Sequence, residues 1–484
     1  METVEESTIE RAWSNLARGF RDIAAGAART LGLSARSLSL TGPALKEAMA
    51  GCLDARGGDV SARLKAAELG QAYSHADAAG RRAFLETLVQ EFDAEPAGIA
   101  SAIEAWQKAD EGARAAEQAA LRAALRPPWE RLMTQFLSLP AGVKFLVDMR
   151  ADLLTYARQN AALKVLDRDL RALLESWFDV GFLDVRRLSW NSPAALLEKI
   201  VHYEAVHEIR SWSDLRNRLE SDRRLYGLFH PRMPDEPLAF VEVALTEGLA
   251  GNVQVLLDET APLVDASAGD SAIFYSISNT QKGLAGIAFG EWLIKKVVSR
   301  LREELPNLKT FATLSPLPGF AGWLTLQQAA LLIRMTPEAE RKKLQGAVIS
   351  ARSFPRALQT ALETANWTGD ETLSEALQPI LRRLCLRYLL DRRADGQSLD
   401  PVARFHLRNG ARLERINWRA DLSANGLTIA HGLMVNYLYD LSTADANREN
   451  YARQGKVTLG SDLKSLARQV TGPRIPALPS IVGH

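Results

Sequence analysis

Three glycines between a strand-like segment and a helix-like segment are the first feature of this sequence that could do chemistry. The strand-like segment, residues 272–278, leads into a polar run that contains Gly283, Gly286 and Gly290. Glycines let a ligand approach the backbone closely, and the unpaired amides of a first helical turn suit a phosphate group. The same glycines would also let a helix pack tightly against a sheet. The pattern alone therefore fits an anion-binding loop and a packing contact equally well.

This glycine run does not match the best-known nucleotide-binding loops. No Lys-Ser or Lys-Thr pair follows Gly290, as a P-loop would need, and the spacing differs from the dinucleotide pattern G-x-G-x-x-G. The two cysteines, Cys52 and Cys385, lie far apart in the sequence, and no histidine cluster accompanies them. We therefore expect neither a metal site nor a disulfide framework.

The segments that must position such a loop differ in composition and apolar spacing along the chain. Residues 1–178 predict helix throughout, because alanine and leucine are abundant and apolar residues recur every three or four positions, as they do from Ile9 to Ile23. Proline and glycine break this region, for example at 39–43 and 126–128. We expect residues 1–178 to form an all-helical bundle for assembly or support.

Patterns typical of β-strands begin after residue 181. Residues 238–245 and 272–278 are rich in strand-forming side chains, residues 284–301 carry a helical apolar stripe, and 311–315 form a short strand. Strand, helix and strand in this order predict parallel neighbours. Residues 321–400 return to a helical pattern. The fold class is therefore α+β, with a mixed α/β domain at 179–484 that contains helical insertions.

The amino-acid composition and the net charge limit the classes of partner that we expect for this chain. Its 47% hydrophobic and 24% charged residues are ordinary for a globular protein, and the net charge of +1 gives no broad field toward nucleic acid or a membrane. The start at Met1 is acidic, and the end at His484 is not a peroxisomal signal. We expect a cytoplasmic protein with no nucleic-acid partner and no membrane span.

Several longer motifs, in one order, resemble the malonyl-CoA decarboxylase family over roughly residues 175–440. The preceding all-helical region is also what that family has. The matching segments are His230-Pro231-x-Met233-Pro234-x-Glu236-Pro237-Leu238, Phe274-Tyr275-Ser276-Ile277-Ser278, Gln281-x-Gly283-Leu284-x-Gly286-Ile287, Leu293-Ile294-Lys295-x-Val297-Val298, Leu314-Ser315-Pro316-x-Pro318-Gly319-Phe320, Phe405-His406-Leu407-x-Asn409-Gly410-Ala411, Asn417-Trp418-x-Ala420-Asp421 and Met434-Val435-Asn436-Tyr437.

The resemblance implies a catalytic domain with the fold of the GNAT superfamily of N-acetyltransferases. In that fold a strand pairs with the pantetheine arm of coenzyme A, and the next helix N-terminus holds the pyrophosphate. The family's acyl-CoA loop maps onto Ala285, Gly286, Ile287, Ala288, Phe289, Gly290 and Glu291. One departure stands out, since some relatives carry an acidic residue where this chain has Ala288.

The resemblance also implies the reaction, which converts malonyl-CoA to acetyl-CoA and CO2. The thioester carbonyl accepts the electron pair that CO2 leaves behind, so the chemistry requires no cofactor. The family's catalytic residues map onto Ser315 and His406. We expect His406 to protonate C2 and Ser315 to hydrogen-bond the malonyl carboxylate or the developing enolate. A proton relay through Ser315 remains open, while the absence of G-x-S-x-G around it argues against hydrolase chemistry.

Other polar residues are weaker candidates. Those that could line or brace the pocket are His230, Glu236, Asn417, Asp421, Asn436 and Tyr437. Those interpreted as structural or surface histidines are His202, His207 and His431. A basic cluster, interpreted as solvated or ion-paired and less readily as a contact for the 3′-phosphate of CoA, comprises Arg382, Arg383, Arg387, Arg392 and Arg393.

Two other functions fit the same domain. An acyl-CoA N-acyltransferase would use the fold to pass an acyl group to an amine, and an acyl-CoA sensor would bind the ligand without chemistry. The Ser315 and His406 pair favours the decarboxylase over both. By analogy with relatives, the helical region predicts a homo-oligomer.

Overall fold

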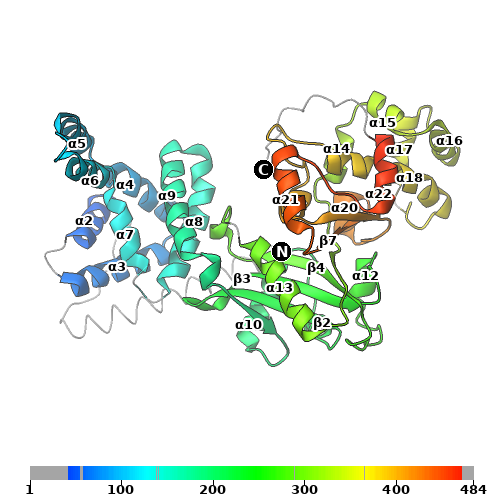
Figure 1. Ribbon diagram of the computed structural model, residues 1–484, viewed down its shortest axis with the longest axis horizontal. Helices are drawn as coiled ribbons and strands as arrows, with labels where there is room; N and C mark the ends of the chain where they lie inside the picture. The colour runs from blue at the N-terminus through cyan, green and yellow to red at the C-terminus, as the bar shows by residue number, and fades with distance from the viewer. Residues whose placement is uncertain are drawn as a thin grey trace. The chain divides into compact units, whose positions relative to one another are not determined.

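A computed structural model describes residues 42–54, 58–137, 139, 141–287, 289–364 and 366–470 (Figure 1). The chain divides into two compact units. The first comprises Met1–Asp184, Phe229–Leu238 and Thr280–Phe289, and the second comprises Val185–Leu228, Ala239–Asn279 and Gly290–His484. The helical stripe expected between Ile9 and Ile23 lies outside the described residues.

The first unit is helical over its described length up to residue 182, as the sequence predicts. Proline residues begin two of its helices, since Pro96 is the first residue of α5 and Pro128 is the first residue of α7. Its helices are α2 (Gly42–Leu53), α3 (Gly58–His75), α4 (Ala78–Glu91), α5 (Pro96–Lys108), α6 (Arg114–Ala124), α7 (Pro128–Leu137), α8 (Gly142–Tyr156), η2 (Ala157–Gln159), α9 (Ala161–Trp177) and η3 (Val180–Phe182).

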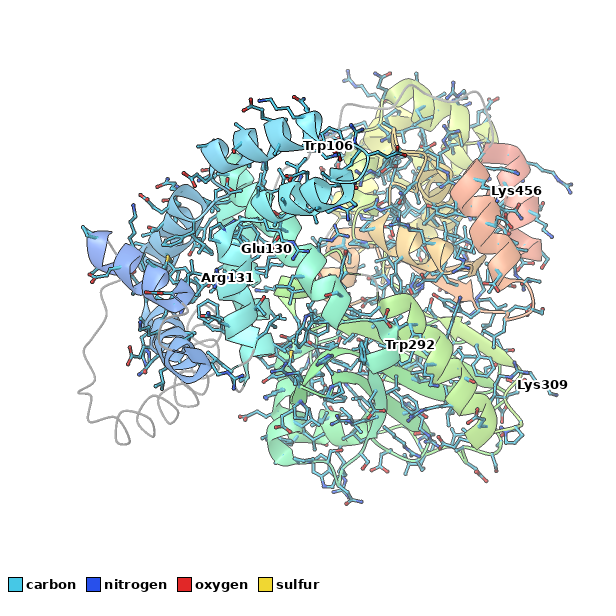
Figure 2. The ribbon with its side chains drawn as sticks, turned by 60° about the vertical axis from the view of Figure 1, so that its left-hand side comes forward. Trp106, Glu130, Arg131, Trp292, Lys309 and Lys456 are labelled. Carbon is cyan, nitrogen blue, oxygen red and sulfur yellow. The ribbon has the colours of Figure 1, made fainter. Side chains whose placement is uncertain are left out.

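Aromatic packing and side-chain caps hold these helices together. The ring of Tyr73 packs edge-on against Phe84 and Phe145, with centroids 4.9 and 5.7 Å apart. Asn160 caps α9 by accepting from the amides of Ala162 and Leu163. Arg131 of α7, labelled in Figure 2, donates to the Leu53 carbonyl at the end of α2.

A seven-stranded mixed sheet runs in the order β1-β2-β3-β4-β5-β7-β6. Strands β4 and β5 pair in parallel, as the strand–helix–strand pattern predicts, and α13 (Gly290–Glu304) connects them. The pairs β3–β4, β5–β7 and β6–β7 are antiparallel. The strands are β1 (Asp184–Leu188), β2 (Arg223–His230), β3 (Met233–Thr246), β4 (Ser271–Asn279), β5 (Thr310–Thr313), β6 (Arg412–Asn417) and β7 (Met434–Leu438).

Helices between β5 and β6 form the predicted helical insertion. The longest of them, α18 (Glu371–Leu390), is buried along most of its length. The remaining helices of the second unit are α10 (Ala194–Tyr203), α11 (Trp212–Asn217), α12 (Val253–Leu256), α14 (Phe320–Thr325), α15 (Ala329–Met335), α16 (Glu338–Ala347), α17 (Phe354–Glu363), α19 (Pro401–Arg408), α20 (Ala424–Ala430), α21 (Ala444–Gln454) and α22 (Ser461–Val470). In the part of the chain that the structure describes, no helix combines the length and apolarity of a membrane span.

Candidate active site

Ser315 and His406, which are 91 positions apart in the sequence, meet in the second unit. The Ser315 Oγ lies 3.0 Å from the His406 Nε2. Ser315 follows the end of β5, and its backbone exchanges two hydrogen bonds with Val435 of β7. His406 lies on α19, which Asp400 caps by accepting from the Ala403 amide. Both side chains are buried, so this contact is fixed by the surrounding fold.

Two tyrosines of the β7 region complete the surroundings of the histidine. The Tyr439 hydroxyl lies 2.7 Å from His406 Nδ1, so both ring nitrogens have a partner. The Tyr437 ring stacks on the imidazole, with centroids 4.5 Å apart. Tyr437 was a candidate from its sequence motif, whereas Tyr439 was not. The signal was present, because side chains two positions apart on an extended segment point to the same side.

The protonation state of His406 follows from its burial. No neighbouring carboxylate offsets the loss of solvent, and burial alone lowers the pKa of His406 to about 3. The ring is therefore neutral near pH 7 and carries one N–H. A neutral ring can accept a proton on one nitrogen while it gives one up from the other.

Thr313 is the second hydrogen-bond partner of the Ser315 hydroxyl besides His406. Its Oγ1 accepts a hydrogen bond of 2.8 Å from Ser315 and one of 3.2 Å from the Tyr437 amide. Its carbonyl accepts a hydrogen bond of 2.7 Å from Asn436 Nδ2. Thr313 was not singled out from the sequence, where a threonine at the end of a short strand carries no distinguishing signal.

Two residues that contact His406, Tyr437 through its ring and Asn409 through its backbone amide, each carry a buried side-chain polar atom without a hydrogen-bond partner among the described residues. These atoms are the Tyr437 hydroxyl and the Asn409 side-chain nitrogen. An unpaired buried polar atom is costly in a closed protein interior and is commonly satisfied by water or a ligand. These two atoms are therefore candidates for contact with the reacting group.

The glycine run supplies contacts within the first unit that the sequence could not show. A side chain on Gly283 would collide with the Val147 carbonyl, so this glycine is required for packing on α8. Gly286 has a φ of +83°, a conformation that favours glycine. Arg150 donates to the carbonyls of Gly283 and Ala285, at 2.7 and 3.0 Å. The carbonyl oxygens of the loop are thus held by protein groups.

The other loop positions are described in part. Arg171 donates to the Gly286 carbonyl at 2.8 Å. Phe289 is buried and Ile287 is half-buried. Gly290 begins α13, and a side chain there would press on the Phe405 ring. Ala288 and the Glu291 side chain lie outside the described residues. The role of residues 285–291 in acyl-CoA binding stays a prediction.

Most of the weaker candidates brace the fold. Both ring nitrogens of His230 bind backbone, at the Trp177 carbonyl and the Arg232 amide. Asp421 accepts from Gln254 and from the Ser423 amide. These contacts occupy both ring nitrogens of His230 and the Oδ1 of Asp421, which fits a structural role for both residues.

The remaining predicted residues differ in their surroundings. Burial lowers the pKa values of His207 and His431 to about 4, and His431 ends α20 in a left-handed conformation. His202 lies in the last turn of α10. Glu236 lies on β3 within the part assigned to the first unit. Within the described ranges, no group of three or more His, Cys, Asp or Glu side chains could hold a metal ion.

The basic cluster on and after α18 separates into two kinds of arginine. Arg382 contributes to a pocket, whereas the other four bind acceptors of the protein. Arg383 binds Glu340, Arg387 binds Asp391, Arg393 binds Asp395 and Arg392 binds the Gly455 carbonyl.

Comparisons with known proteins agree over most of the chain. Family models described as the malonyl-CoA decarboxylase N-terminal and C-terminal domains match residues 92–178 and 181–475. The mitochondrial malonyl-CoA decarboxylase of Mus musculus is 37% identical over 366 residues, which are 72% of this chain and 73% of the mouse protein. That of Anser anser anser is 34% identical over 427 residues, or 84% of each chain.

Solved structures show the same likeness. The crystal structure of malonyl-CoA decarboxylase from Rhodopseudomonas palustris matches with a TM-score of 0.77 and 40% identity, over 87% of this chain and 98% of the other. The enzyme from Agrobacterium vitis matches with a TM-score of 0.77 and 39% identity, over 87% and 99% of the two chains.

Proposed function

Because the chain belongs to the malonyl-CoA decarboxylase family, we propose that it converts malonyl-CoA to acetyl-CoA and CO2. The observation that carries the proposal is the buried chain of contacts from Thr313 through Ser315 and His406 to Tyr439. Hydroxyl groups on both sides of a neutral imidazole form a path along which a proton can move.

The reaction requires little beyond binding, charge stabilisation and one proton. When the bond from C2 to the carboxylate breaks, its electron pair passes to C2 and the thioester carbonyl, and CO2 leaves. The enolate that results takes one proton at C2 to become acetyl-CoA, and solvent replaces that proton. A hydroxyl aimed at the developing oxyanion would lower the barrier by a few kcal/mol.

Ser315 is the better placed of the two residues to touch the substrate. His406 reaches C2 directly only if one of its two ring contacts opens, whereas Ser315 reaches the substrate when its O–H turns from Thr313, and it then keeps its contact with His406. We therefore place the Ser315 hydroxyl at the reacting group and His406 behind it as the proton source. The relay that the sequence left open thus becomes the preferred form of the mechanism.

The binding of acyl-CoA extends this proposal to the rest of the domain. The parallel pair β4–β5, joined through the glycine run and α13, is the arrangement that a GNAT-like fold would use for CoA. We assign residues 285–291 to that role, residues 179–484 to the catalytic domain and residues 1–178 to assembly as a homo-oligomer. A cytoplasmic location completes the proposal, although the vertebrate relatives are named mitochondrial.

One assay separates the three candidate functions. The full chain is incubated with malonyl-CoA and no amine, and acetyl-CoA and CO2 are measured. A decarboxylase forms both in equal amounts, an N-acyltransferase needs an amine, and a sensor leaves malonyl-CoA unchanged. In D2O the methyl group of the acetyl product should carry deuterium. An intact substrate after long incubation would refute the decarboxylase.

A further inference from the structure

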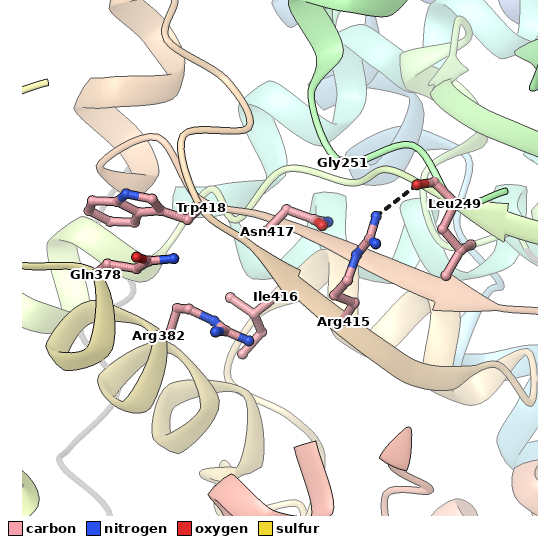
Figure 3. Close-up of a pocket in the computed structure, with 8 residues that line it drawn as sticks. All are labelled: Leu249, Gly251, Gln378, Arg382, Arg415, Ile416, Asn417 and Trp418. Atoms are coloured by element: carbon pink, nitrogen blue, oxygen red, sulfur yellow. Dashed lines mark hydrogen bonds between the residues drawn. The ribbon is translucent and has the colours of Figure 1, made fainter. Parts of the chain in front are cut away.

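An open pocket of about 410 Å³ lies in the second unit, between α18 and β6 (Figure 3). Helix α18 contributes Gln378 and Arg382, and β6 with the residue after it contributes Arg415, Asn417 and Trp418. The described residues that line the pocket include two guanidinium groups, two side-chain amides and no carboxylate. Its lining is therefore cationic and rich in hydrogen-bond donors.

Arg415 is held in position by two neutral acceptors. Its Nε donates to the Asn436 side-chain oxygen at 3.1 Å, and its Nη2 donates to the Leu249 carbonyl at 2.9 Å. Burial is the main cause that lowers the pKa of Arg415, and the charge of Arg382 lowers it further, against the opposite influence of Asp462 and Glu414. A bound anion would relieve this unfavourable burial of positive charge.

Arg382 differs from the other arginines of its cluster because it binds no acceptor among the described residues. Its Nε is buried without a hydrogen-bond partner, as one nitrogen each of Arg387 and Arg392 also is, but those two residues bind carbonyls through other nitrogens. Figure 3 shows its side chain at the pocket beside Ile416, with Gln378 one turn earlier on the same helix. A guanidinium that lines an open pocket and binds no acceptor among the described residues is suited to an anion that supplies two or more acceptor oxygens.

Neighbouring side chains of β7 contact the pocket and the candidate active site. Neighbouring side chains on a strand point to opposite faces of the sheet. Asn436 accepts hydrogen bonds from Arg415 and Asn417 of the pocket, whereas the next residue, Tyr437, stacks on His406. A ligand in the pocket would therefore not occupy the space around the His406 ring.

We propose that this pocket binds an organic phosphate, with the phosphate oxygens on Arg382 and Arg415. Two guanidinium groups match the charge of a phosphate dianion and its several acceptor oxygens. A volume of about 410 Å³ exceeds what inorganic phosphate needs and is in the range of small-molecule sites. The half-buried Trp418 provides an apolar wall for the organic part of the ligand.

The phosphate group can come from two sources that share this chemistry. One is the 3′-phosphate of CoA itself, and the other is a separate nucleotide. The first source would extend the proposed substrate site, and the second would make the pocket independent of it. Adenosine 3′,5′-bisphosphate, ADP and pyrophosphate serve as probes, because they carry the phosphate groups without the thioester.

Calorimetry on the full chain tests the site with matched variants. Arg382→Gln should weaken binding of the phosphate probes by about tenfold, as expected for the loss of one charge-assisted contact. Gln378→Glu, which adds a negative charge to the same wall, should weaken it as well. Arg393→Gln removes an equal charge from a half-exposed, ion-paired arginine nearby and should bind as the wild type does.

The outcomes decide whether the pocket binds an organic phosphate and which molecule carries that phosphate. If CoA displaces the probes and Arg382→Gln weakens the binding of CoA in the same calorimetric titration, the 3′-phosphate of CoA is the ligand. If ADP binds alongside saturating CoA, the ligand is a separate nucleotide. Unchanged affinity in a folded Arg382→Gln or Gln378→Glu variant, or no binding of any probe to the wild type at millimolar concentration, overturns the site. None of these results depends on measured decarboxylation by the variants, so failure of the proposed activity is detected separately.

Discussion

The Ser315–His406 centre and the glycine loop at 281–290 are stabilised in different ways. In the centre, hydroxyl groups and a neutral imidazole bind one another, and no ion pair is involved. In the loop, two arginines hold the backbone carbonyls of Gly283, Ala285 and Gly286. A neutral buried network suits proton transfer, whereas a loop fixed through its carbonyls suits ligand positioning. The comparison therefore predicts that changes in the centre affect turnover and changes in the loop affect binding.

The largest effect is expected from the catalytic pair. Ser315→Ala and His406→Asn should each lower kcat by roughly 10²- to 10⁴-fold, because each removes a group that acts on the reacting malonyl unit. The affinity for free CoA, measured by calorimetry, should change little. Ser442→Ala, which removes an exposed serine hydroxyl, is the matched control. Near-normal turnover in either variant would remove that residue from the mechanism.

A smaller effect on kcat is expected from Tyr439, the last group of the proposed proton path. Tyr439→Phe removes the hydroxyl that contacts His406 Nδ1 and should lower kcat by roughly tenfold to a hundredfold. Steady-state kinetics and CoA titration should again separate turnover from binding. Tyr226→Phe also loses a buried tyrosine hydrogen bond, to Glu304, and should leave kcat near the wild-type value. Equal kcat in Tyr439→Phe and the wild type would show that the path ends at His406.

The loop should show the opposite behaviour. Gly286→Val places a side chain at a φ of +83°, beside the Arg171 guanidinium, and should weaken binding of CoA and malonyl-CoA by about tenfold. The kcat at saturating substrate should stay close to normal. Gly396→Val, at a φ of +78° with open space around it, controls for backbone strain alone. Unchanged CoA affinity in a folded Gly286→Val variant would leave this glycine with a conformational role only.

The smallest effect concerns stability as a function of pH. Burial lowers the pKa of His406 to about 3, below its ordinary value of 6.5. Between these values the unfolded chain binds a proton that the folded chain does not, so stability falls as the pH drops from 6.5 toward 3. In His406→Asn the decline of Tm between pH 6.5 and 4 should be shallower. It should persist in part, since His207 and His431 act in the same direction.

An unchanged slope in His406→Asn would contradict the neutral, buried state of this histidine. It would also weaken the argument for the relay, which depends on a ring that is uncharged before the substrate binds. Differential scanning fluorimetry at closely spaced pH values is sufficient to measure the slope.

Much of the fold was predictable because its signals are local. Apolar spacing and the breaks at Pro96 and Pro128 indicated the helices of the first unit, and the strand–helix–strand pattern indicated the parallel pair β4–β5. The order of the sheet was not predictable in the same way. Strands β6 and β7 follow a long helical insertion, and β7 pairs with β5 through contacts that no short-range pattern contains.

The amino-acid sequence by itself determined the family, the α+β class and the two residues expected to do the chemistry, because long motifs in a given order are specific. It did not decide whether the glycines serve packing or anion binding, or whether the arginines are ion-paired or contact a ligand. Only the tertiary structure decided that Gly283 packs on Val147 and that Arg382 alone in its cluster faces a pocket without a protein acceptor among the described residues. It also added Thr313 and Tyr439 to the candidate site. The physical reason is that hydrogen bonding, burial and pKa depend on neighbours in space, and these neighbours can be distant in the sequence, as Gly283 and Val147 are at 136 positions apart.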